Sequence, residues 1–205
     1  VVRRGVAGVT GGGGKPALLS RRGRGRGGGG LVRAATTTGL RPRAHLPVRH
    51  AGEGPLRARR KTGPACAGTP AEGGKLAEPS FADWMTLADY TLVEADGSKG
   101  LPLKAHAPHE PVIPPQSNQT ILVLGAEGLG RTVAQAAHRP ALYARLAGAE
   151  EGSGVTPALA ARMLRAEGLH DRVFVNQAGD WGRRADAGRA LAAEVDCPGA
   201  AGSLR

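Results

Sequence analysis

Apolar residues gather in short runs that predict alternating strands and helices along this 205-residue chain. Short Val, Leu and Ile runs predict buried strands, whereas apolar residues at helical spacing between capping residues predict helices. The predicted strands are 6–10, 31–38, 90–95, 120–124 and 173–175, and the predicted helices are 16–22, 80–88, 140–147, 157–168 and 185–195. This order is typical of an α/β fold with a mainly parallel sheet and flanking helices.

Two of the helices are marked at both ends. Pro140 suits a first helical turn, and Gly148 suits the position just after a helix. Thr156 and Pro157 form a capping residue followed by a first turn, and Gly168 provides the stop. We therefore place these helix boundaries more firmly than the others.

Charge and aromatic content divide the chain into unlike parts. Residues 1–60 hold 14 Lys and Arg against a single acid, Glu53, while all six aromatic residues follow position 80. We predict one α/β domain whose main body is 64–205, preceded by a phosphate-loop and second-strand segment, 1–38, and a basic linker or disordered loop, 39–63. The basic stretch 21–60 would bind nucleic acid only nonspecifically, since no aromatic residue interleaves it.

A glycine loop follows the first predicted strand. Gly11, Gly12, Gly13 and Gly14 precede Lys15, and a short apolar helix is predicted next. The order strand, glycine loop with lysine, helix is used to cradle phosphates, because glycine N–H groups and the lysine face the anion. A plain flexible glycine run is the alternative.

The run from Leu92 to Lys104 is the richest in candidate chemistry. Glu94 and Asp96 end an apolar strand, and residues two apart on a strand share a face, so both carboxylates are candidates for a catalytic and metal-binding pair. Lys99 and Lys104 follow and are candidates for holding an anion. Solvated residues that close a strand are the alternative for the two carboxylates, and ordinary surface lysines are the alternative for Lys99 and Lys104.

Further candidates lie in three places downstream. His109 and Glu110 stand between prolines, and His138 and Arg139 precede Pro140; we consider these four as anion or substrate contacts or as structural corners. Asn176 and Gln177 follow the strand 173–175 and are weak candidates for reading a nucleotide base. Asn176 suits a ligand site because it falls at the carboxyl end of a predicted strand, as Glu94 and Asp96 do.

With these motifs identified, the chain resembles the selenium-dependent hydroxylase accessory protein family, also described as selenium cofactor biosynthesis protein YqeC. The resemblance covers about 64–180 well and the N-terminal part partially. The matching runs are 67–70, 74–76, 93–98, 101–105, 109–115, 125–130, 138–140, 155–157 and 175–177.

The resemblance implies a P-loop NTPase-like fold and a cytoplasmic bacterial accessory protein in selenium cofactor biosynthesis. It further implies ATP or GTP with Mg²⁺ as cofactors, and a selenium-dependent molybdenum hydroxylase or a selenium-handling protein as partner. Here Lys15 is followed by Pro16 where the family pattern has Thr or Ser, so the hydroxyl that ligates Mg²⁺ is absent. Magnesium-dependent nucleotide hydrolysis or phosphoryl transfer, a noncatalytic chaperone-like binding protein and a basic nucleic-acid binder therefore all stay open. No apolar run is long enough to predict a membrane span.

Overall fold

The computed structural model describes six stretches of the chain. They are residues 5–11, 31–35, 48–50, 65–71, 75–77 and 90–203, the last without 180 and 181. The chain divides into two compact units, and it passes from the first unit to the second between Asp96 and Gly97. The first unit holds 1–9, 16–96 and 112–119, and the second holds 10–15, 97–111 and 120–205.

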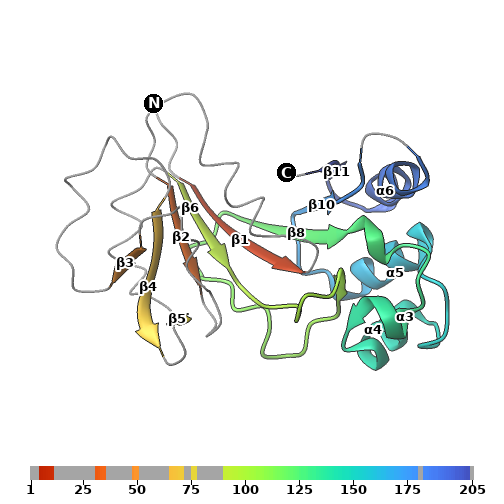
Figure 1. Ribbon diagram of the computed structural model, residues 1–205, viewed down its shortest axis with the longest axis horizontal. Helices are drawn as coiled ribbons and strands as arrows, with labels where there is room; N and C mark the ends of the chain where they lie inside the picture. Colours follow the sequence, from red (N-terminus) through yellow and green to blue (C-terminus); the bar gives the residue numbers. More distant parts are fainter. Residues whose placement is uncertain are drawn as a thin grey trace. The chain divides into compact units, whose positions relative to one another are not determined.

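The first unit is built on parallel strands. Its strands are β1 (Gly5–Gly11), β2 (Leu31–Ala35), β3 (Val48–His50), β4 (Ala65–Ala71), β5 (Lys75–Ala77) and β6 (Tyr90–Glu94). They run in the order β1-β6-β2-β4-β3, all parallel, with β5 antiparallel to β4 (Figure 1). β6 thus lies between β1 and β2 in the sheet, although β3, β4 and β5 come before it in the sequence.

The second unit has its own parallel strands. β8 (Gln119–Gly125), β10 (Arg172–Asn176) and β11 (Gly199–Ala201) run in the order β11-β10-β8. The strands are in register, with Asn176 opposite Gly125 and Val175 opposite Ala201. Asp171 fastens the start of this pair, since its carboxylate accepts a hydrogen bond from the Thr120 N–H at 2.6 Å and its own N–H donates to the Thr120 carbonyl.

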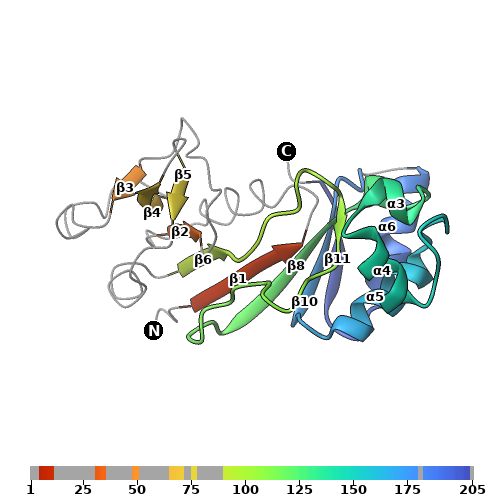
Figure 2. The same ribbon diagram turned by 90° about the horizontal axis from the view of Figure 1, so that it is seen from below.

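Helices cover the strands of the second unit (Figure 2). They are η3 (Ala126–Gly128), α3 (Val133–Ala136), α4 (Pro140–Ala147), α5 (Pro157–Glu167) and α6 (Arg183–Glu194). The Thr156 hydroxyl caps α5 by accepting a hydrogen bond from the Leu159 N–H, and Gly148 and Gly168 end α4 and α5 in the left-handed conformation. These ends confirm the sequence prediction closely.

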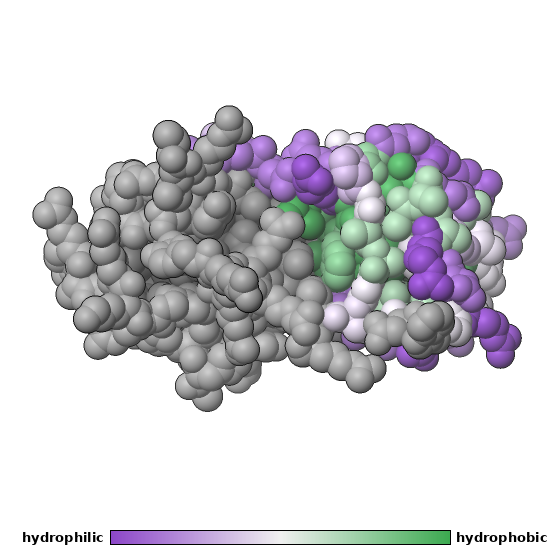
Figure 3. Space-filling model, turned by 90° about the horizontal axis from the view of Figure 1, so that it is seen from above, coloured by the Kyte–Doolittle hydropathy of each residue, from purple (hydrophilic) through white to green (hydrophobic). Residues whose placement is uncertain are grey.

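The core of the second unit is aliphatic apart from one buried aromatic ring. Leu122 and Leu124 of β8, Val175 of β10 and Met163 of α5 are buried together with Tyr143. In the space-filling view, hydrophilic residues lie around the margins of the described part of the second unit and a more apolar band lies between them (Figure 3). No helix in the described ranges has the length and apolar character needed to cross a bilayer.

Several predicted elements differ from the observed ones. β3 lies within 39–63, which we expected to be a linker or disordered loop, and its backbone pairs with β4. The main boundary between the compact units lies at 96/97, within the predicted main body 64–205, and β6 on its N-terminal side pairs with β1 and β2. The predicted helices 16–22 and 80–88 lie outside the described residues. The α/β class with parallel strands is confirmed.

Candidate functional site

Two very short strands hold a buried lysine in the second unit. β7 (Leu103–Lys104) pairs in parallel with β9 (Ala137–His138), and Lys104 is opposite His138. The Lys104 side chain has no solvent exposure, and its amine donates to the Gly97 carbonyl oxygen at 2.7 Å. The same amine lies 2.7 Å from Oε2 of Glu110. A buried ammonium requires such partners, since its desolvation is costly.

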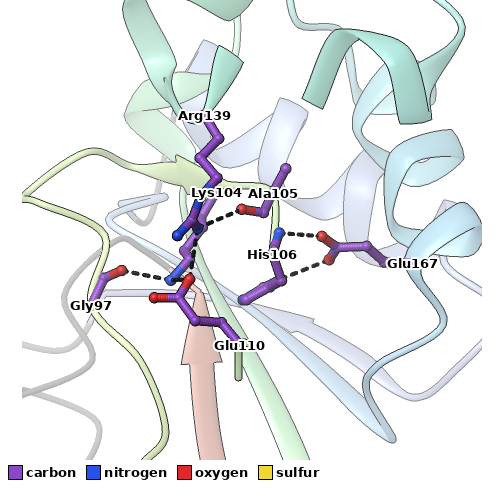
Figure 4. Close-up of polar contacts among 7 residues, drawn as sticks. All are labelled: Gly97, Lys104, Ala105, His106, Glu110, Arg139 and Glu167. Atoms are coloured by element: carbon purple, nitrogen blue, oxygen red, sulfur yellow. Dashed lines mark hydrogen bonds and ion pairs between the residues drawn. The ribbon is translucent and has the colours of Figure 1, made fainter. Parts of the chain in front are cut away.

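Arg139, which directly follows β9, approaches the same carboxylate (Figure 4). Its Nη1 donates to Oε2 of Glu110 at 2.6 Å and to the Ala105 carbonyl oxygen at 3.2 Å. The Arg139 backbone is in the left-handed region, with φ of 63°, directly before Pro140 at the start of α4. The strand pair thus brings two cations, 35 positions apart in sequence, onto a single oxygen atom.

The charges in this cluster shift two pKa values. Burial by itself would raise the pKa of Glu110, but the hydrogen bonds from Arg139 and Lys104, with their charges, hold it below its usual value. The pKa of His138 is lowered by burial and by the positive charges of Arg139, Lys104 and Lys99. Glu110 is therefore ionised and His138 neutral near pH 7.

A second polar contact joins His106, two residues after Lys104, to Glu167. Glu167, at the end of α5, accepts a hydrogen bond from the His106 N–H at 2.6 Å, and its other oxygen lies 2.9 Å from Nδ1 of His106 (Figure 4). Both side chains are almost fully buried. Burial and the Glu167 charge raise the pKa of Tyr143, whose hydroxyl has no hydrogen-bond partner among the described residues. The His106–Glu167 pair therefore fastens the loop after Lys104 to α5.

The predicted carboxylate pair lies at the end of β6 in the first unit. The strand ends at Glu94, which is half-buried, and Asp96 follows two residues later with no solvent exposure. Because β6 stops before Asp96, a shared strand face does not determine how these two side chains point. Gly11 ends β1, whereas Gly12, Gly13, Gly14 and Lys15 lie outside the described residues.

The remaining predicted residues divide between the cluster and other places. Lys99 is exposed, with φ of 52°, and His109 is also exposed and makes no hydrogen bond or ion pair with a described residue. Asn176 ends β10 and is buried, and Gln177 follows with φ of 59°. The structure thus joins Lys104, Glu110, His138 and Arg139, and it leaves His109 and the Asn176–Gln177 pair apart from them.

A cavity of about 190 Å³ lies elsewhere in the second unit, between the end of α5 and the segment after α6. Its lining includes His170 and Cys197. Burial lowers the pKa of His170, and burial together with nearby Asp196 and Asp171 raises the pKa of Cys197. The thiol is therefore protonated near pH 7, which does not favour a nucleophilic cysteine. Within the described stretches, no group of three or more His, Cys, Asp or Glu side chains is arranged to hold a metal ion.

His106 and Glu167 are the polar residues of this region that the sequence analysis missed. The alternation of Leu103, Lys104, Ala105 and His106 carries a weak signal, because polar residues at every second position of an apolar segment point to one face. Nothing in the sequence identifies Glu167, which lies 61 positions from His106. Its role depends entirely on where α5 ends.

The fold and these polar groups define an α/β protein with parallel strands, a carboxylate-bearing strand end and a buried cation cluster. Comparison with known families gives a match to the YqeC protein family over residues 7–141. The chain belongs to the YqeC family. The matched span contains the glycine loop, the end of β6 and the whole Lys104, Glu110 and Arg139 cluster, and it ends before Glu167.

One curated relative is similar over a short stretch. The chain is 46% identical over 61 residues to the "Uncharacterized protein YqeC" of Escherichia coli (strain K12). The match covers 29% of this chain and 24% of that protein, so it spans about a quarter of the relative's length. No solved structure matches the chain.

Proposed function

We propose that this chain is a nucleotide-binding accessory protein in selenium cofactor biosynthesis or in the maturation of selenium-dependent molybdenum hydroxylases. Membership of the YqeC family supports the biological setting, through the resemblance described above. The nucleotide-binding part is carried by one structural observation, the parallel pairing of β1 with β6. A cytoplasmic location belongs to the same proposal.

The parallel register of β1 and β6 supports a phosphate site at the carboxyl ends of these strands. Val9 is opposite Glu94, and β1 continues only as far as Gly11. The two strands are parallel, so their carboxyl ends lie at the same edge of this sheet; the glycine loop follows β1 in sequence, and Glu94 is the last residue of β6. Ligands of open parallel α/β sheets bind at the carboxyl ends of the strands, which favours a phosphate site here.

The residue types at this edge suit the phosphates and a magnesium ion. Glycine N–H groups and Lys15 provide donors for an anion, while Glu94 and the fully buried Asp96 provide the oxygen ligands that Mg²⁺ prefers. A bound magnesium ion would neutralise phosphate charge. The Lys15 ammonium would then attract the phosphates, and the buried carboxylate would keep the cation at the strand end.

One residue favours a second, noncatalytic form of this function. Pro16 has no N–H to donate and no hydroxyl to ligate magnesium. In the noncatalytic form, the nucleotide binds without turnover and the chain acts as a chaperone-like partner of a hydroxylase or of a selenium-handling protein. The two forms share the binding site and differ in phosphate release.

Nucleotide titration of the full chain tests both forms. We expect ATP or GTP to bind more tightly with Mg²⁺ than without, and Lys15→Ala and Asp96→Asn to lose this binding. Asp196→Asn is the matched control, because Asp196 is 71% exposed and far from β6 in sequence. Glu94→Gln provides a second variant in case Asp96→Asn fails to fold.

Phosphate release separates the two forms of the proposal. Release by the natural chain, or a gain of release in Pro16→Thr, supports turnover, whereas binding without release in both supports the noncatalytic form. Equal nucleotide affinity in Lys15→Ala, Glu94→Gln and the natural chain would refute the nucleotide site. Affinity that collapses with salt and needs residues 21–60 would indicate nonspecific nucleic-acid binding in its place.

A further inference from the structure

The cation cluster in the second unit brings two positive side chains onto one carboxylate. Glu110 Oε2 accepts from both Lys104 and Arg139. Lys99 has no ion pair or hydrogen bond with any residue in the described ranges, and its charge still reaches His138. Lys99, Lys104 and Arg139 therefore influence one neutral imidazole from three positions in the chain.

Arg139 keeps hydrogen-bonding capacity for a ligand. Only Nη1 is engaged, by Glu110 and by the Ala105 carbonyl, so Nη2 and Nε have no partner in the described part of the chain. The side chain is 26% exposed, compared with 0% for Lys104. An arginine presents its donors in a fixed planar fork that matches the spacing of oxygen atoms on an oxoanion.

Among the described residues, the charges of Arg139, Lys104 and Lys99 lower the pKa of His138, and the charge of Glu110 raises it by less. Lys99 and Arg139 also both hold left-handed backbone conformations, with φ of 52° and 63°. Such conformations are strained for residues other than glycine, and they occur often at binding sites.

We propose that Arg139, Lys99, Lys104 and His138 form a binding site for a phosphoryl-type oxoanion. Lys104 is the buried anchor that fixes the Glu110 carboxylate, and Glu110 fixes one edge of the Arg139 guanidinium. The free edge of Arg139 and the exposed Lys99 ammonium then face the ligand, and neutral His138 offers a ring nitrogen. This site goes beyond the proposed nucleotide function and does not require that the glycine loop bind phosphate.

Sulfate and inorganic phosphate are suitable probes for calorimetric titration of the full chain at constant ionic strength. We expect Arg139→Ala to weaken sulfate binding by about tenfold or more, since hydrogen bonds between charged groups contribute on that scale. Lys99→Ala should weaken it by a smaller factor, about two- to fivefold, as expected for an exposed charge. Arg162→Ala is the matched control, because Arg162 is exposed on α5 and makes no ion pair with a described residue.

Glu110→Gln distinguishes a binding site from a purely structural ion cluster. Removing the Glu110 charge, which pairs with both Lys104 and Arg139, should raise sulfate affinity, whereas a structural role alone predicts lower stability without tighter binding. Lys99→Ala serves where Arg139→Ala folds poorly, because the Lys99 side chain is exposed and makes no ion pair or hydrogen bond with a described residue. Sulfate affinity that is unchanged in Lys99→Ala and not raised in Glu110→Gln would overturn the proposal.

The source of the oxoanion is resolved by repeating the titrations with ATP. If Arg139→Ala weakens both phosphate and ATP, the site holds a nucleotide phosphate; if it weakens phosphate alone, the ligand is a separate phosphorylated molecule or free phosphate. Lys15→Ala separates this proposal from the nucleotide site. Loss of sulfate binding in Lys15→Ala with full binding in Arg139→Ala would refute the present proposal and leave the nucleotide site standing.

Discussion

Two polar clusters flank Ala105 and differ in how completely their groups are satisfied. His106 meets Glu167 through two contacts, and the side chains of both residues are almost entirely buried. Lys104, two residues earlier, shares the Glu110 carboxylate with Arg139, which is partly exposed and has donors without a partner among the described residues. The comparison shows that one short segment can provide both a closed structural contact and an open, positively charged one. Polar character alone does not distinguish the two clusters. The number of partners of each polar group and the exposure of its side chain distinguish them.

The largest expected effect comes from breaking the closed cluster. Glu167→Ala leaves the His106 N–H and ring nitrogen without their acceptor in a buried place, and we expect a loss of about 3 kcal/mol in the free energy of unfolding. Chemical denaturation followed by circular dichroism measures this loss. Glu194→Ala, at the end of α6 and exposed, is the control. An unchanged free energy of unfolding would show that the two clusters do not differ in structural importance.

A steric change beneath the open cluster should have the next largest effect. A Cβ atom on Gly128 would lie 2.8 Å from Cγ of Leu103, the neighbour of Lys104 in β7. Gly128→Ala should cost about 2 kcal/mol by overpacking and should displace Lys104 with its strand. Gly152→Ala is the control, since no atom lies within 4 Å of that position. Thermal unfolding distinguishes the two variants, and equal midpoints would contradict the packing described for β7.

A variant of the α5 cap tests whether Glu167 acts through its contact with His106 or through the stability of its helix. Thr156→Ala removes the acceptor for the Leu159 N–H at the opposite end of α5, and we expect a loss of about 1 kcal/mol. Thr156→Ser keeps a hydroxyl and should retain most of the stability. If Thr156→Ala costs as much as Glu167→Ala, the effect of Glu167 comes from the helix and not from His106.

The pH dependence of stability gives the smallest and most selective effect. The pKa of Glu110 is lower in the folded chain than its ordinary value of 4.5, so its ionised form stabilises the fold above that pH. This contribution, which we expect to be under about 1 kcal/mol, is lost as the pH falls through the folded pKa. The difference in unfolding free energy between the natural chain and Glu110→Gln should therefore shrink below pH 4.5. A difference that grows on acidification would contradict the assigned ion pairs.

Local signals in the sequence were sufficient for the helices of the second unit. Thr156, Gly148 and Gly168 have the expected cap conformations because capping is determined by neighbouring residues in the chain. β3 was missed because three residues with an arginine between them have no periodicity that distinguishes a strand from a loop. The two-residue strands β7 and β9 were missed for the same reason.

The candidate anion residues were recognised one by one, but their grouping was not. Lys104, Glu110, His138 and Arg139 were each noted for charge or for a neighbouring proline, whereas His109 was noted on the same grounds and lies outside the cluster. Pairing across β7 and β9 selects the members, because it places Lys104 opposite His138. No spacing rule in the sequence encodes that pairing.

The sequence by itself determined the α/β class, the capped helices α4 and α5 and the family, since these depend on contiguous residues and their periodicity. Tertiary structure alone decided that Lys104 is buried, that Arg139 shares its carboxylate partner and that Glu167 holds His106. These contacts join residues 29 to 61 positions apart. Their energies depend on desolvation and on the meeting of distant groups, and neither quantity can be read from local patterns.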